Sequence, residues 1–152
     1  MAKRKNNRHP FARFLFLAYC GLMFWLLFCR TKGWINGLSY GQMLRQNINL
    51  VPLLTIQNYL YVILNRTNDA LLLHCIINLA GNVLMFIPIG YLLPKIWPIQ
   101  RKFFLFVATC AGSIFLVETL QLFTLLGSFD IDDIILNLSG MTIGYLFAIL
   151  KK

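Results

Sequence analysis

The stretch FLVETLQLFTLLGSFDIDDIILNLSG, residues 115–140, joins two apolar runs through a short turn that carries three aspartates. Two polar residues, Glu118 and Gln121, stand inside the first run. A membrane helix needs about 20 mostly apolar residues, and each run continues far enough beyond this stretch to supply them. The stretch therefore predicts two membrane helices joined by an acidic hairpin.

The composition of the whole chain supports the same environment. Of its 152 residues, 59% are hydrophobic and only 12% are charged, with a mean hydropathy of +0.69. Soluble domains average about 25% charged residues. A soluble core of this size cannot bury so much apolar surface, so we predict one all-α integral membrane domain over residues 1–152.

Four apolar runs have the length and composition of membrane helices. They cover about residues 14–29, 71–93, 103–126 and 134–150. Within the second run, Pro88 predicts a kink, because proline lacks an amide hydrogen, and Pro94 predicts the end of the helix. In the fourth run, Gly140 and Gly144 predict a surface of small residues that lets another helix approach closely.

The distribution of basic residues predicts the orientation. The formal net charge is +9, and ten of the fourteen basic residues fall on one side of the predicted spans: Lys3, Arg4, Lys5, Arg8, Arg13, Lys95, Arg101, Lys102, Lys151 and Lys152. Short cytoplasmic segments carry such an excess. We therefore expect a multi-pass protein of the cell membrane with both termini in the cytoplasm. Because membrane orientation accounts for the basic clusters, no nucleic-acid partner is expected.

Residues 49–65, NLVPLLTIQNYLYVILN, leave two alternatives open. A fifth span would place the basic segment 95–102 outside the cell, against the charge rule. The run is also short, holds polar residues at its middle, and carries Tyr59 and Tyr61, a residue type typical of the membrane interface. We prefer an interfacial or re-entrant helix at the outer leaflet. The glycine-containing segment 31–48 is predicted to be an outer loop.

Polar side chains recur at helical spacing within the predicted spans. Glu118 and Gln121 are three residues apart, and Asn78 and Asn82 are four apart, so each pair shares a helix face. A charged or amide group inside a membrane either binds a neighbouring helix or lines a functional cavity. Both interpretations remain open for each residue taken alone.

The five acidic residues all fall in the predicted outer half of the protein: Asp69, Glu118, Asp130, Asp132 and Asp133. Aspartates at a helix start can simply cap it, although one is enough. We instead predict an outward-facing acidic pocket between the second, third and fourth spans, suited to a cationic or hydroxyl-rich ligand. Its candidate residues are Asn78, Asn82, Glu118, Gln121, Asp130, Asp132, Asp133 and Asn137.

Neither a cofactor nor a metal site is predicted. The acidic spacing matches no calcium loop. Four isolated cysteines, without CxxC spacing, indicate neither a zinc site nor a disulfide framework. His74, Ser113, Ser128 and Ser139 form no recognisable nucleophile–base set, which favours a binding protein over an enzyme.

Several of these motifs together resemble the VanZ-like family of bacterial membrane proteins. The resemblance rests on NLVPL (49–53), NLAGNVLMFIPIGYLLP (78–94) and ETLQLFTLLGSFDIDDIILNLSGMTIGY (118–145). One departure lies just before the aspartates, where many members carry an arginine and this chain has Gly127, Ser128 and Phe129. The acids would then be exposed or be paired with Arg45 or Arg66.

The resemblance implies a multi-pass membrane protein, in contact with membrane lipids, and a link to resistance against the glycopeptide teicoplanin. The expected role is therefore to bind or shield against a glycopeptide, or to bind a lipid-linked cell-wall precursor, at the cell envelope. Two alternatives stay open. One is an outer-leaflet enzyme acting on a lipid-linked precursor, and the other is a small transporter that uses Glu118 as a proton site.

Overall fold

A computed structural model of the chain describes residues 10–29, 37–66 and 68–150. The lysines and arginines at 3–8, the whole segment 30–36, and Lys151 and Lys152 lie outside these ranges. Six α-helices, one 3-10 helix and two very short strands make up the described part. They are α1 Pro10–Phe28, α2 Tyr40–Gln46, β1 Ile48–Asn49, α3 Leu54–Asn65, α4 Asp69–Ile96, η1 Pro98–Arg101, α5 Phe103–Phe123, β2 Phe129–Asp130 and α6 Ile131–Leu150.

Four of these helices, α1, α4, α5 and α6, are long and apolar enough to cross a membrane. They confirm the all-α membrane fold and the four predicted spans. The expectation that Pro94 ends the second span is wrong, because α4 continues to Ile96. Proline removes one amide donor, yet the next residues can stay helical, and the Trp97 amide still donates to the Leu93 carbonyl at 2.9 Å.

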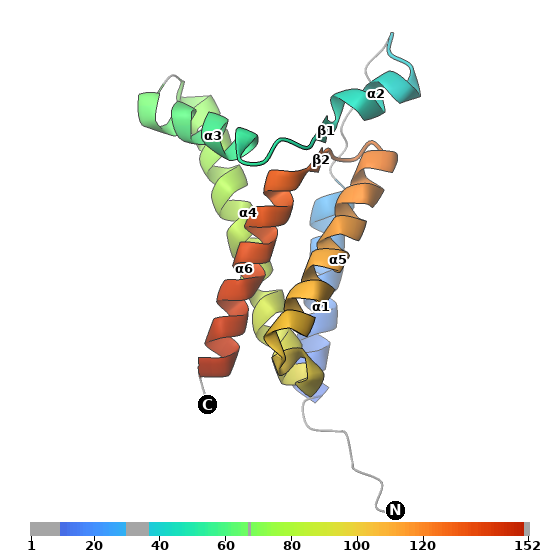
Figure 1. The fold of residues 1–152 in the computed structure, drawn as a ribbon, viewed down its shortest axis with the longest axis vertical. Coiled ribbons are helices and arrows are strands. Elements are labelled where there is room, and N and C mark those ends of the chain that lie inside the picture. Colours follow the sequence, from blue (N-terminus) through green and yellow to red (C-terminus); the bar gives the residue numbers. More distant parts are fainter. Residues whose placement is uncertain (1–9, 30–36, 67, 151–152) are drawn as a thin grey trace, which may run out of the picture.

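The elements are divided between the two ends of the bundle (Figure 1). The start of α1, the end of α6 and η1 lie at one end, whereas α2, α3, β1 and β2 lie at the other. Arg13, Lys95, Arg101 and Lys102 therefore belong to the end opposite the aspartate turn. This is the arrangement that four crossings produce; the assignment of the basic end to the cytoplasm remains a prediction.

The segment 49–65 does not form a fifth crossing. Its helix, α3, has 12 residues, or about 18 Å at about 1.5 Å per residue, against a hydrocarbon layer of about 30 Å. It packs against α4 and α6 at the end of the bundle that holds the aspartate turn (Figure 1). The predicted loop 31–48 is wrong for its second half, because Ser39 and Gln42 form a capping box that starts α2.

The closest contact between spanning helices joins α4 and α6. A Cβ atom added to Gly140 would overlap the Val83 carbonyl, and one added to Gly144 would overlap the Ile87 carbonyl. On the facing helix, a Cβ at Gly90 would overlap the backbone of Met141. The small-residue surface predicted from Gly140 and Gly144 is therefore present, and Gly90 completes it from the other side.

Candidate functional site

Two sequence motifs separated by about 80 residues meet at the acidic end of the bundle. Strand β1, from the NLVPL segment, pairs in parallel with β2, which begins the aspartate turn; Asn49 lies opposite Asp130. The Asp130 carboxylate accepts hydrogen bonds from the Thr55 hydroxyl at 2.6 Å and from the Asn49 amide at 3.3 Å. It also accepts from the Asp132 amide at 2.9 Å, which caps the start of α6.

Asp132 caps a helix other than its own. Its carboxylate accepts hydrogen bonds from the backbone amides of Leu53 at 2.5 Å, Thr55 at 2.8 Å and Ile56 at 3.1 Å. These amides lie at the start of α3, where Leu53 has a φ of +67° and supplies no side-chain cap. Since Asp132 is completely buried, its position fixes α3 to the start of α6.

Asp133 points to the third neighbour, α4. The Asn82 side-chain amide donates to the Asp133 carboxylate at 2.5 Å. This bond joins two spanning helices at the level where α4 and α6 still leave space between them. Asp130 and Asp132 therefore both bind the start of α3, and Asp133 binds α4.

A polar cavity of about 490 Å³ lies beside these contacts. Seven of the eight predicted site residues line it: Asn78, Asn82, Glu118, Gln121, Asp130, Asp133 and Asn137. Asp132 does not line it, because its carboxylate is directed to the amides of α3. The helices α4, α5 and α6 thus bring to one cavity polar residues that are up to 59 positions apart in the sequence.

One buried hydrogen-bond acceptor among the described lining residues stays unpaired after the internal bonds are formed. The Gln121 amide nitrogen donates to the Leu27 carbonyl at 3.0 Å, and the Asn82 nitrogen is directed to Asp133. The carbonyl oxygen Oδ1 of Asn137, a residue only 3% exposed, has no hydrogen-bond partner among the described residues. A ligand that supplies N–H or O–H donors would satisfy such a group.

Other lining residues were not among the predicted set. Thr55 and Tyr59 come from α3, and His74 from the first turns of α4. His74 stands four residues before Asn78, and the Asn78 amide nitrogen lies 3.0 Å from Nε2 of its ring; helical spacing could therefore have identified it. Nothing in the sequence marks Tyr59, because its place depends on how α3 folds over the spans.

Tyr59 lies on α3, outside the spanning helices, and its surroundings in the cavity change the pKa of its phenol. Partial burial raises the pKa of the Tyr59 phenol above its ordinary value, and the negative charge of Asp133 raises it further. A phenol held in its neutral form keeps its O–H as a donor. Its O–H is thus one of the donor groups of the lining.

The structure also places the two arginines and the histidine and serines that were considered from the sequence. Arg45 and Arg66 are exposed, and amide and hydroxyl donors surround the carboxylates of Asp130 and Asp132. His74 and Ser128 line the cavity, whereas Ser113 lines a separate one. Within the described ranges, no three histidine, cysteine or acidic residues are grouped as metal ligands.

These features define a class: a small multi-pass membrane protein in which the acidic end of the bundle encloses a polar cavity. The sequence model of the VanZ/LLP1 family matches residues 16–152. The chain therefore belongs to the VanZ/LLP1 family. No characterised protein and no solved structure matched the chain in the same comparisons.

Proposed function

We propose that this protein is a binding protein of the cell envelope whose polar cavity faces outward and takes a hydroxyl-rich or cationic group. The convergence of seven polar residues on one cavity, six from three spanning helices and one from β2, supports this proposal. Helix contacts account for the amide nitrogens of Gln121 and Asn82, which bond to α1 and α6. They do not explain why Glu118, Asp133 and Asn137 also line the same cavity.

The chemistry of the lining supports a ligand with several hydrogen-bond donors. Three carboxylates, from Glu118, Asp130 and Asp133, stand among the lining residues that the structure describes. Hydrogen bonds to charged acceptors are stronger than neutral ones, and an ammonium or sugar hydroxyl group can form them. Glycopeptide antibiotics and lipid-linked cell-wall precursors both carry such groups. Family membership favours teicoplanin as the ligand to test first.

The test is resistance itself. Expression in a teicoplanin-susceptible strain is expected to raise the inhibitory concentration of teicoplanin. Glu118→Gln and Asp133→Asn, which keep the size of each side chain but remove its charge, are expected to abolish that rise. The protein level in the membrane is measured in parallel, so that loss of the protein is not mistaken for loss of binding.

Asp69→Asn is the matched control, because Asp69 is acidic and predicted to be outside, yet it is exposed at the start of α4 and does not line the cavity. It should leave the inhibitory concentration at the wild-type value. The proposal fails if wild-type protein gives no rise, or if Glu118→Gln and Asp133→Asn give the same rise as Asp69→Asn.

A further inference from the structure

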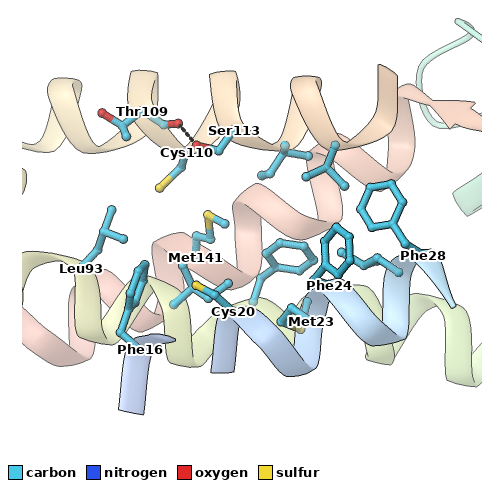
Figure 2. Close-up of a pocket in the computed structure, with 15 residues that line it drawn as sticks. Phe16, Cys20, Met23, Phe24, Phe28, Leu93, Thr109, Cys110, Ser113 and Met141 are labelled. Atoms are coloured by element: carbon cyan, nitrogen blue, oxygen red, sulfur yellow. Dashed lines mark hydrogen bonds between the residues drawn. The ribbon is translucent and has the colours of Figure 1, made fainter. Parts of the chain in front are cut away.

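A second cavity, of about 290 Å³, lies among the four spanning helices and is lined mainly by apolar side chains (Figure 2). In the close-up, α5 lies along one side, with Thr109, Cys110 and Ser113, and α1 lies opposite, with Phe16 and Met23. An apolar protein cavity of about 150 Å³ stays dry and binds benzene. This one has space for a longer hydrocarbon group.

The few polar groups in its wall are already used within α5. The Ser113 hydroxyl donates to the Thr109 carbonyl, and the Thr109 hydroxyl donates to the Leu105 carbonyl, both at 2.8 Å. The Ser113 bond is drawn in Figure 2. Their donors are therefore not available to a ligand, and the cavity is suited to hydrocarbon rather than to water.

The apolar cavity continues the polar one along the bundle. On each of α4, α5 and α6, a lining residue of the polar cavity stands four positions from a lining residue of the apolar cavity. In every case the apolar residue is one turn, about 5.4 Å, closer to the basic end. The pairs are Asn82 with Phe86, Glu118 with Ile114, and Asn137 with Met141.

The fourth helix, α1, joins the two cavities. Leu27 lines both of them. Its carbonyl oxygen accepts the hydrogen bond from Gln121, which lines the polar cavity. The two cavities therefore share a wall residue on α1.

We infer that the two cavities form one site for an amphiphile, with a donor-rich head in the polar cavity and a single hydrocarbon chain in the apolar cavity. The head half of this inference rests on the proposed function. A membrane lipid and a lipophilic antibiotic would share this chemistry. Because lipid tails are as apolar as the cavity wall, burial of the chain alone gives little preference. The head must therefore select the ligand.

A photoactivatable alkyl maltoside, with a diazirine in its chain, is a suitable probe because its head carries many hydroxyl groups. The purified protein in phosphatidylcholine nanodiscs is labelled, and the labelled positions are mapped by mass spectrometry. We expect labels on wall residues of the apolar cavity, such as Met23 and Cys110. An alkane with the same diazirine and no head should label these positions about tenfold less, because it lacks the selecting hydrogen bonds.

Two pairs of substitutions test the chain half. Cys20→Phe and Ser113→Phe add bulk at positions that line the apolar cavity, whereas Cys29→Phe and Ser139→Phe add bulk at exposed positions that line neither cavity. The first pair should lower maltoside labelling about tenfold, and the second pair should leave it unchanged. Asn137→Leu, which removes the buried acceptor at nearly constant size, tests the head half and should also lower labelling.

Lower labelling in Cys20→Phe and Ser113→Phe, together with lower labelling in Asn137→Leu, supports the single site. Loss in Cys20→Phe and Ser113→Phe alone overturns it and removes support from the proposed function, since the head would then not use the polar cavity. Loss in Asn137→Leu alone overturns the chain half and leaves the proposed function standing. Equal labelling by the maltoside and the alkane, or labels mainly on exposed residues such as Phe104 and Leu146, also overturns the inference.

Discussion

Asp130, Asp132 and Asp133 lie within four positions of each other, and each carboxylate accepts from its own set of donors. Asp132 binds the amides of α3, Asp130 binds Thr55 and the start of α6, and Asp133 binds Asn82 on α4. Two of the three also line the polar cavity. Capping and cavity lining are thus not alternatives for this turn, because Asp132 caps α3 while Asp130 both caps α6 and lines the cavity.

Asp132→Ala is predicted to destabilise the protein more than any other single change of an aspartate. It would leave three backbone amides at the start of α3 without their acceptor, and replacing a helix cap by alanine costs about 0.5–2 kcal/mol. With the buried amides left unsatisfied, we expect about 2 kcal/mol or more. Thermal unfolding in detergent measures it, with the exposed Asp69→Ala as the control. Equal shifts in both variants would contradict this account of Asp132.

The raised pKa of Tyr59 predicts that the stability of the folded protein falls at alkaline pH. Its pKa is raised in the folded protein by burial and by Asp133, so the unfolded chain loses the phenolic proton at a lower pH than the folded one. The stability contribution is therefore complete below the unfolded pKa of about 10 and is lost as the pH rises through the folded pKa. Tyr59→Phe should remove this part of the alkaline fall.

The measurement is the unfolding temperature from about pH 8 to about pH 11. Tyr61→Phe is the control, because the Tyr61 ring is 65% exposed on the same helix. If the alkaline fall is equally steep in wild-type protein and in Tyr59→Phe, then Tyr59 does not cause it.

At the scale of elements, the contact between α4 and α6 organises the bundle. These two helices make the most extensive pairing in the described part of the chain, and glycines on both sides allow it. The cavity residues Asn82 and Asn137 stand next to this crossing in the sequence, at one residue before Val83 and three before Gly140. Their separation therefore depends on how closely the two backbones approach.

Gly140→Ala is predicted to force α4 and α6 apart, because its new methyl group would overlap the Val83 carbonyl. Overpacking costs about 1–3 kcal/mol even where side chains can adjust, and backbone cannot move as easily. Gly81→Ala on α4 meets nothing within 4 Å and should be neutral or slightly stabilising. Thermal unfolding compares the two. A Gly140→Ala protein as stable as Gly81→Ala would contradict the observed packing.

Much of this element arrangement was predictable. Hydropathy identifies the four spans because an apolar run of about 20 residues has few other environments. Periodicity places Glu118 with Gln121, and Asn78 with Asn82, on common faces. The role of Asp132 was not predictable, since its partners on α3 are more than 75 residues away. The prediction that the second span ends at Pro94 was wrong because proline removes only its own amide donor and disturbs one carbonyl, and does not by itself end a helix.

At the scale of the whole molecule, basic residues and the aspartate turn lie at opposite ends of the bundle. The spans place Lys95, Arg101 and Lys102 at one end and the aspartate turn at the other (Figure 1). The excess of lysine and arginine predicts that the first end faces the cytoplasm. The polar cavity would then open toward the outside, where an envelope ligand is found.

Fusions at the C-terminus test this orientation. We predict that a green fluorescent protein fused after Lys152 is fluorescent and that an alkaline phosphatase at the same place is inactive, as for a cytoplasmic terminus. The reverse is expected for fusions made within the turn near Ser128. An active phosphatase after Lys152 would show that the C-terminus lies outside the cell. The polar cavity would then face the cytoplasm, which would contradict the predicted orientation.

The central claim is that the polar cavity is accessible to water and that the apolar cavity begins one helical turn beyond it, further into the bundle. Asn82→Cys and Phe86→Cys, one turn apart on α4, test it in a chain whose four native cysteines are replaced by alanine. A charged, membrane-impermeant thiol reagent is added to intact cells. The account predicts fast modification of Asn82→Cys and almost none of Phe86→Cys. Modification of both at similar rates, or of neither, would contradict it.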